Sequence, residues 1–160
     1  MSSPTELPAR SPRASHTEMT ELVLPQHSNA IGTAFGGTVL AWIDICGAIT
    51  AQRHSGYVSV TAAIDQVNFL SPIRVGDVVI LTGRLNAAFR SSVEVEVEVQ
   101  VEDRATAQRR LCVDAFMTFV AVDEHGKPVA IPTLAVETAE DERRKREAEA
   151  RRAHRLAQRR

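Results

Sequence analysis

A nearly continuous apolar helix, entered through a polar and glycine-bearing loop, dominates the first half of the sequence. The loop starts at Asn29 and runs into Phe35-Gly36-Gly37, and apolar side chains then cover most of the helical wheel as far as Ile49. A helix that is apolar on nearly every side is a buried helix. It is too short and too interrupted to span a bilayer, which needs about 20 unbroken apolar residues. The rest of the chain must therefore pack around it.

Asp44 is a single carboxylate in the middle of this apolar helix. An ionised carboxylate there is costly unless it is hydrogen-bonded, so Asp44 is either a satisfied structural residue or a general base. It follows Gly37 by seven residues, which is about 10 Å along a helix axis. One helix cannot easily bring both groups to the same small ligand. If two subunits pack their helices side by side, Asp44 of one chain faces Gly37 and Asn29 of the other.

The hydrophobic period changes to two after the helix, which we expect to end near Gly56. Between Ser92 and Glu102, valines alternate with polar residues that are mostly glutamates, a pattern typical of a half-buried antiparallel strand. Further strands are predicted over residues 18–24, 57–69, 77–87 and 109–122. These elements predict an α+β domain in which an antiparallel sheet wraps around one central helix. The glutamate row would discourage unwanted strand pairing if its face is open.

The two ends of the chain differ in composition from the segment between them. Residues 1–16 are rich in Ser, Pro and Arg and are predicted to be a disordered tail. Residues 17–134 form the predicted domain. Residues 135–160 are almost only Glu, Arg and Ala, with the acidic residues first, which predicts a charged helix. This helix is either a solvated element or subunit contact, or a contact for a phosphorylated ligand or an RNA.

Composition excludes several classes of function. The net charge is −1 and aromatic residues make up 4% of the chain, which argues against nucleic acid and membrane surfaces as partners. Cys46 and Cys112 lie in apolar surroundings and are interpreted as core residues in a reducing compartment. No signal peptide is recognised, so a cytoplasmic location is expected. The histidines lack metal-ligand spacing, and no motif supports a Ser-His-Asp triad.

The junction between loop and helix carries candidate catalytic groups. Gly36 and Gly37 allow a ligand to approach the backbone, and the free N–H groups of a helix start suit a developing negative charge. Asn29 adds an amide donor, and Phe35 is placed to exclude water. The alternative is a tight turn that Asn29 merely caps.

Arg90, Ser91 and Ser92 form a second candidate site at the start of the valine strand. Their charge, hydroxyls and N–H groups suit a phosphate. A simple turn explains the same residues equally well.

The loop and helix residues are similar to a known signature. Residues 29–37, NAIGTAFGG, resemble the N-x-x-G-x-x-F-G-G motif of the acyl-CoA hydrolases of the hotdog fold. The resemblance covers about residues 18–134, which is most of the chain. It continues in order through Trp42-Ile43-Asp44, Arg53-His54, Asn68-Phe69-Leu70-Ser71-Pro72-Ile73, Val75-Gly76-Asp77, Ser91-Ser92-Val93-Glu94-Val95, Phe119-Val120-Ala121-Val122-Asp123 and Gly126-Lys127-Pro128 to Pro132. It implies a single hotdog domain that hydrolyses acyl-CoA.

The resemblance also implies an assembly and a set of roles. Subunits pair into a dimer with a continuous sheet and active sites at the interface, commonly as a trimer of dimers. Asp44 and Asn29 are then the catalytic pair, Gly37 is the oxyanion donor, and no metal or organic cofactor is needed. Phe35 and Gly36 are expected to line the substrate, and Arg90, Ser91 and Ser92 to contact the phosphates of CoA.

Two other functions remain as alternatives. A hotdog hydratase or dehydratase needs a catalytic histidine near the helix, but His54 lies at the end of the helix and not opposite Asp44. A non-catalytic module that binds or senses acyl-CoA would use the same fold, since one fold hosts many functions. A transcription regulator of this kind would also need a DNA-reading domain, for which the ends of the chain leave no room.

Overall fold

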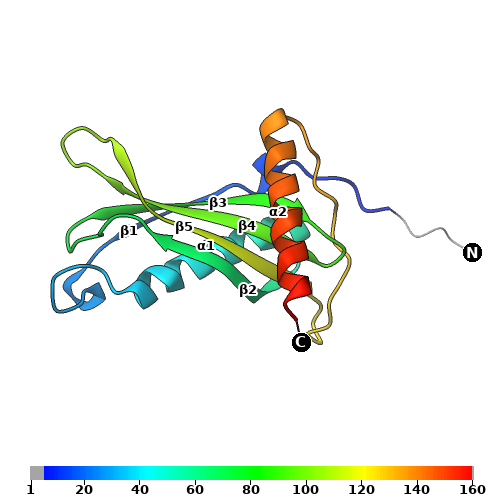
Figure 1. Cartoon of the computed structure of the whole chain (residues 1–160), viewed down its shortest axis with the longest axis horizontal. Helices are drawn as coiled ribbons and strands as arrows, with labels where there is room; N and C mark the ends of the chain where they lie inside the picture. Colours follow the sequence, from blue (N-terminus) through cyan, green and yellow to red (C-terminus); the bar gives the residue numbers. More distant parts are fainter. Residues whose placement is uncertain (1–5, 160) are drawn as a thin grey trace, which may run out of the picture.

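The computed structural model describes residues 6–159 and consists of one long helix packed against a five-stranded antiparallel sheet (Figure 1). The order of strands in the sheet is β1-β3-β4-β5-β2. The predicted α+β class, with an antiparallel sheet around one central helix, is confirmed. The elements are η1 (Pro12–Ser15), β1 (Thr17–Leu22), η2 (Pro25–His27), α1 (Gly36–Ser55), β2 (Val58–Phe69), β3 (Val78–Ala88), β4 (Ser92–Glu102), β5 (Arg109–Val122) and α2 (Ala139–Ala157).

The core lies between α1 and the sheet. Val95, Val97 and Val99 of β4 are fully buried, as their alternation with glutamate predicted. The helix approaches the sheet closely at Gly47, where an added Cβ would lie 2.7 Å from Phe119 Cε2. Only glycine allows this contact, so the packing distance between α1 and β5 is set there.

The side of α1 that faces away from the sheet is not buried within one chain. Ile43 is fully buried, whereas Ile45 is 50% exposed and Asp44 is partly exposed. The expectation of a helix buried all round is therefore wrong for the described chain, because the sheet covers only one side of α1. A large apolar face that is left exposed indicates a surface for association.

The prediction of a disordered tail over residues 1–16 is wrong from Arg10 onward, and residues 1–5 lie outside the described residues. Arg10 forms a parallel bridge with Leu134, and its guanidinium donates to the carbonyl of His54 at the end of α1, at 2.8 Å. η1 follows and buries Ser15. These contacts join segments far apart in the sequence, which composition alone does not reveal.

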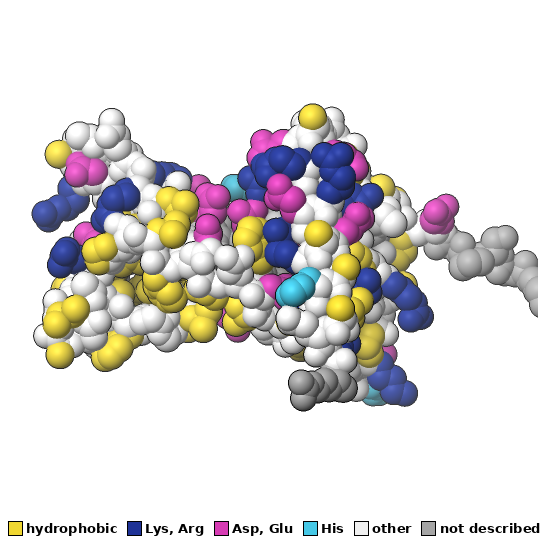
Figure 2. Space-filling view, in the orientation of Figure 1, with side chains coloured by type: hydrophobic (Ala, Val, Ile, Leu, Met, Phe, Trp, Pro, Cys, Tyr) yellow, Lys and Arg dark blue, Asp and Glu magenta, His cyan; other side chains and the backbone are white. Residues whose placement is uncertain are grey.

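The C-terminal helix α2 is docked on the sheet and is not a purely solvated helix. It lies on the outer face of the sheet, the face that carries the glutamates of β4 (Figure 1). Arg151 pairs with Glu94 at 2.7 Å, and Arg144 pairs with Glu96. Glu94 is only 1% exposed, so α2 covers this part of the glutamate row and the condition of an open face is not met there. Figure 2 shows basic and acidic side chains interspersed over this helix.

The sheet ends at β2, which pairs with β5 on one side only within the described chain. Large apolar side chains along β2 are exposed, among them Val58 at 62%, Val60 at 47% and Ile64 at 41%. No helix within residues 6–159 is long and apolar enough to cross a membrane.

Candidate active site

The carboxylate of Asp44 is held by a hydroxyl from the edge strand. Thr61 of β2 donates its Oγ1 hydrogen to Asp44 Oδ1 at 2.6 Å. The register of β2 against β5 shifts between Thr61 and Ala63, which leaves Ala62 as a bulge. Bulges re-aim side chains at sheet edges and near active sites. Here the strand presents Thr61 to α1, while Ala62 and Ala63 line a hollow on the outer face beside α2.

Asn29 organises the loop that precedes the helix. Its Oδ1 accepts hydrogen bonds from the backbone N–H groups of Ile31 and Thr33, each at 3.1 Å. Its Nδ2 donates to Thr33 Oγ1 at 2.7 Å. The structural alternative for Asn29 is thus realised. An amide carries two N–H donors, and the second is not engaged by any of the residues described here, so a catalytic role is still compatible with this geometry.

The start of α1 leaves backbone N–H groups available to a ligand. The N-cap residue is Phe35, whose side chain has no acceptor atom, and no side-chain cap bond is formed there. Gly37 is exposed, and the space beside its Cα is open to at least 4 Å. The positive end of the helix dipole therefore points at an accessible surface, which suits an anionic oxygen.

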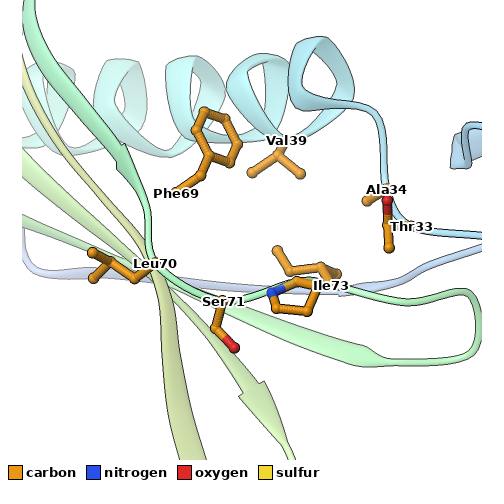
Figure 3. Close-up of a pocket in the computed structure, with 8 residues that line it drawn as sticks. Thr33, Ala34, Val39, Phe69, Leu70, Ser71 and Ile73 are labelled. Atoms are coloured by element: carbon orange, nitrogen blue, oxygen red, sulfur yellow. The ribbon is translucent and has the colours of Figure 1, made fainter.

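An apolar hollow of about 250 Å³ lies beside this helix start (Figure 3). Its lining comes from the loop, from α1, and from the end of β2 with the segment that follows: Thr33, Ala34, Val39, Phe69, Leu70, Ser71, Pro72 and Ile73. Phe69 lies against the first turn of the helix, since a Cβ on Gly36 would be 3.5 Å from its ring. The volume is below the ~300–1,000 Å³ of common small-molecule sites. This fits a hollow that a second subunit completes.

A single chain does not bring all the predicted residues together. Asn29, Phe35, Gly36 and Gly37 gather at the N-terminal end of α1, whereas Asp44 lies about two turns further along, or ~10 Å. Each chain thus carries two separate halves of a site, one with donors and one with a carboxylate.

The candidate phosphate contacts are divided between two hollows. Ser91 and Ser92 line the outer-face hollow with arginines of α2. Arg90 is exposed and lines a different hollow beside Phe89 and Ile131. The three consecutive residues therefore do not act on one ligand group within a single chain.

Two buried side chains with reactive groups, His54 and Cys46, do not join the site. His54 is 1% exposed, and its Nε2 lies 2.8 Å from the carbonyl of Pro132, at the far end of α1 from Gly37. Burial lowers the pKa of His54, so the ring is neutral at pH 7. Burial also raises the pKa of Cys46 to about 11, which makes its thiol a poor nucleophile. Among residues 6–159, no group of three His, Cys, Asp or Glu is arranged to hold a metal ion.

Thr61 is the candidate site residue that the sequence reasoning missed. Thr61 lies in a strand whose alternation of inward and outward side chains is interrupted by the bulge at Ala62. The hydrophobic periodicity of the sequence therefore does not predict that Thr61 faces the helix. The strand also contains Ser59, Asp65, Gln66 and Asn68, so the polarity of Thr61 did not distinguish it either.

Comparisons with known proteins identify the family of the chain. A family model of the thioesterase superfamily matches residues 31–108. An uncharacterized acyl-CoA thioester hydrolase of Bacillus subtilis is 41% identical over 122 residues, which cover 76% of this chain and 71% of that protein. The chain spans only 24% of a mouse acyl-coenzyme A thioesterase to which it is also 41% identical.

Solved structures extend the likeness to the whole fold. The acyl-CoA hydrolase of Staphylococcus aureus, in complex with butyryl coenzyme A and coenzyme A, has a TM-score of 0.88 at 36% identity, covering 94% of this chain and 92% of that one. Alanine variants of that enzyme at one asparagine, one aspartate and one threonine have also been solved. An apo-hexameric acyl-CoA thioesterase has a TM-score of 0.89 at 41% identity, covering 96% of this chain and all of that one. This chain has the hotdog fold and belongs to the acyl-CoA thioester hydrolases of the thioesterase superfamily.

Proposed function

We propose that the protein is an acyl-CoA thioesterase that hydrolyses acyl-CoA to a free fatty acid and CoA. The observation that carries the proposal is the Asp44 carboxylate, which accepts the Thr61 hydroxyl at 2.6 Å on the side of α1 that the sheet leaves uncovered. Because the chain belongs to the acyl-CoA thioester hydrolases, the reaction proposed for this carboxylate is hydrolysis of a thioester. The asparagine, aspartate and threonine variants solved for the Staphylococcus aureus relative match the residue types of Asn29, Asp44 and Thr61.

In the proposed reaction, Asp44 accepts a proton from a water molecule while the water oxygen attacks the thioester carbonyl carbon. The oxyanion of the resulting intermediate is stabilised by the backbone N–H of Gly37 and by the unengaged amide hydrogen of Asn29. The carbon–sulfur bond then breaks, and the proton held by Asp44 passes to the departing thiolate. The products are a carboxylic acid and free CoA. No step requires a metal or an organic cofactor.

The two halves of the site are proposed to meet across a dimer interface. The uncovered side of α1 and the free edge of β2 carry the exposed apolar residues Ile45, Val58 and Val60. Pairing two β2 edges would continue the sheet and bury these residues. Asp44 and Thr61 of one subunit would then face Gly37 and Asn29 of the other. The hexameric relative supports further assembly as a trimer of dimers.

The substrate contacts proposed from the sequence fit this arrangement. Phe35 and Gly36 directly follow Ala34, which lines the apolar hollow, and would contact the acyl-thioester end of the substrate. Ser91 and Ser92 would contact phosphate groups of CoA, and Arg90 would act from its own hollow. A cytoplasmic location stays a prediction.

Release of free thiol from a panel of acyl-CoAs, from acetyl to palmitoyl, tests the proposed activity directly. The wild type is expected to release thiol. Asp44→Asn is expected to lower kcat at least ~100-fold with the fold retained, because an amide cannot accept the proton from water. A mutant with full activity would exclude Asp44 as the base.

The second candidate function is a module that binds acyl-CoA without consuming it. The engagement of Asn29 in its own loop favours this reading, because part of its hydrogen-bonding capacity is already used. A folded, oligomeric wild type that binds acyl-CoA and releases no thiol would favour it.

A further inference from the structure

The edge strand that carries Thr61 contains two bulges close together. The register of β2 against β5 shifts at two places, which leaves Ala62 and Asp65 outside the pairing. Between these bulges, only Ala63 and Ile64 are paired with β5. A bulge disrupts the ladder of backbone hydrogen bonds and bends its strand. Pairing with β5 alone therefore holds this part of β2 weakly.

The second bulge is held from the outer face of the sheet by the C-terminal helix. Arg155 of α2 donates to the carboxylate of Asp65, with Nη1 2.7 Å from Oδ2. The side chains of Arg155 and Asp65 are 18% and 14% exposed. An ion pair so far removed from solvent is little screened by salt, and loss of one partner leaves the other charge uncompensated. The backbone of β2 is thus tied down at the point where it leaves the regular ladder.

The helix α2 is itself fixed to the centre of the sheet, so it can serve as a rigid support for β2. It crosses the outer face of the sheet (Figure 1). Arg144, Arg151 and Arg155 follow one another at intervals of seven and four residues, which places them on one face of the helix. The first two pair with Glu96 and Glu94 of β4. The third continues the same row of contacts to the edge strand.

The ion pair on the outer face can affect the site on the inner face through the bulged segment. Thr61, four residues before Asp65, donates its hydroxyl hydrogen to Asp44 on the inner side. Bulges re-aim the side chains of their strand, so the direction of Thr61 depends on the conformation of this segment. A shift of about 1 Å in a catalytic contact can cost a large factor in rate. Whatever fixes the bulges therefore also fixes how the Asp44 carboxylate is held.

We propose that Asp65 is a positioning residue for thioester hydrolysis, because its ion pair with Arg155 fixes the bulged part of β2 and so aims Thr61 at Asp44. This role rests on the proposed function, since it supports the same site. The alternative is that the ion pair only docks α2 on the sheet. In the proposed role, the C-terminal helix contributes to the rate of the reaction and not only to the stability of the fold.

Steady-state kinetics on one acyl-CoA tests the role of Asp65. Asp65→Ala is expected to lower kcat about threefold to tenfold, because the base is less well oriented. KM should not rise, since this variant keeps Arg155, which lines the outer-face hollow with Ser91 and Ser92. Asp65→Glu restores a carboxylate that can reach Arg155 and should recover most of kcat.

Glu96→Ala is the matched control. Glu96 has the same 14% side-chain exposure as Asp65 and pairs with Arg144 of α2, but it belongs to β4. Both variants are expected to lower the melting temperature, since each removes a contact between α2 and the sheet. Only Asp65→Ala should lower kcat. An equal loss of kcat in the two variants would overturn the proposal, because it would assign the effect to the docking of α2.

A double-mutant cycle tests whether Asp65 acts through Thr61. In the Thr61→Val background, Asp65→Ala should lower kcat no further, because the contact that it would disturb is already absent. Independent losses that multiply, or full kcat for Asp65→Ala alone, would contradict the proposal. If Asp65→Ala does not fold, Asp65→Asn keeps the side-chain shape and allows the same comparison with Glu96→Gln.

The methyl resonance of Thr61 tests the positioning role independently of activity. In NMR spectra of protein labelled at threonine methyl groups, Asp65→Ala should shift the Cγ2 resonance of Thr61, and Glu96→Ala should not. An unshifted resonance in Asp65→Ala would overturn the proposal. If the wild type releases no thiol while the resonance shifts as expected, the proposed function fails and the coupling between Asp65 and Thr61 stands.

Discussion

At the scale of single residues, the contact between Thr61 and Asp44 determines how the carboxylate is held. Thr61→Val keeps the side-chain shape and removes the hydroxyl that donates to Asp44 at 2.6 Å. We expect kcat to fall about tenfold, or ~1.4 kcal/mol in activation free energy, with a small change in KM, because the base is less well oriented. Steady-state kinetics on one acyl-CoA measures this.

A serine substitution tests whether Thr61 acts by orienting the Asp44 carboxylate or only by packing. Thr61→Ser restores a hydroxyl and should recover most of kcat, whereas Thr61→Val should not. Equal activity of all three proteins would mean that the hydrogen bond has no catalytic consequence.

The sequence was most informative about residues whose chemistry conflicts with their surroundings. Asp44 in an apolar helix and two glycines at the helix start were recognisable without a structure. Thr61 was not, because its direction depends on a bulge in β2 that no local pattern encodes. Arg90 was grouped with Ser91 and Ser92 by adjacency, although its side chain lines a different hollow.

At the scale of elements, Asp141 anchors the start of α2. It is 2% exposed and accepts hydrogen bonds from Arg13, Arg84 and the backbone N–H groups of Glu137 and Thr138. Although burial opposes it, the hydrogen bonds, chiefly from Arg13, lower the pKa of Asp141 to about 2. A carboxyl whose pKa falls on folding stabilises the fold above its unfolded pKa, near 4, and loses that effect as the pH drops toward 2.

Asp141→Asn should therefore lower the free energy of unfolding by about 2 kcal/mol at pH 7. The difference from wild type should shrink between pH 4 and pH 2, as the wild-type carboxyl becomes protonated. Urea unfolding at several pH values measures this, with Glu142→Gln on the exposed side of α2 as the control. A difference that does not depend on pH would show that charge at Asp141 does not stabilise α2.

The strands could be predicted from the sequence better than the ends of the chain. The alternation of valine and glutamate gave the bounds of β4, Ser92–Glu102, because one face of that strand packs on α1. Docking of α2 was not predictable, since it depends on pairs such as Arg151 and Glu94 that lie 57 residues apart. The N-terminal segment was misjudged for the same reason: Arg10 is ordered by Leu134 and His54.

At the scale of the whole molecule, the uncovered side of α1 links assembly to activity. Ile45 is 50% exposed and adjoins Asp44. Ile45→Lys is expected to place a charge in the dimer interface, yield monomers and abolish turnover, because donors and base would no longer meet. Light scattering and thiol release measure both effects.

A lysine introduced outside the proposed interface tests whether the effect of Ile45→Lys depends on its position. Val136 is 37% exposed and lies in the segment before α2, outside α1 and β2, so Val136→Lys should leave both size and activity unchanged. An active monomer of Ile45→Lys would show that one chain forms a complete site.

The free edge of β2 also has a consequence for handling the protein. An unpaired strand with exposed valines is a template for indiscriminate strand addition. Occupying that edge with an identical strand removes the template, so self-association protects the chain against aggregation as well as completing a site. Interface mutants of this protein should consequently be judged for solubility as carefully as for catalysis.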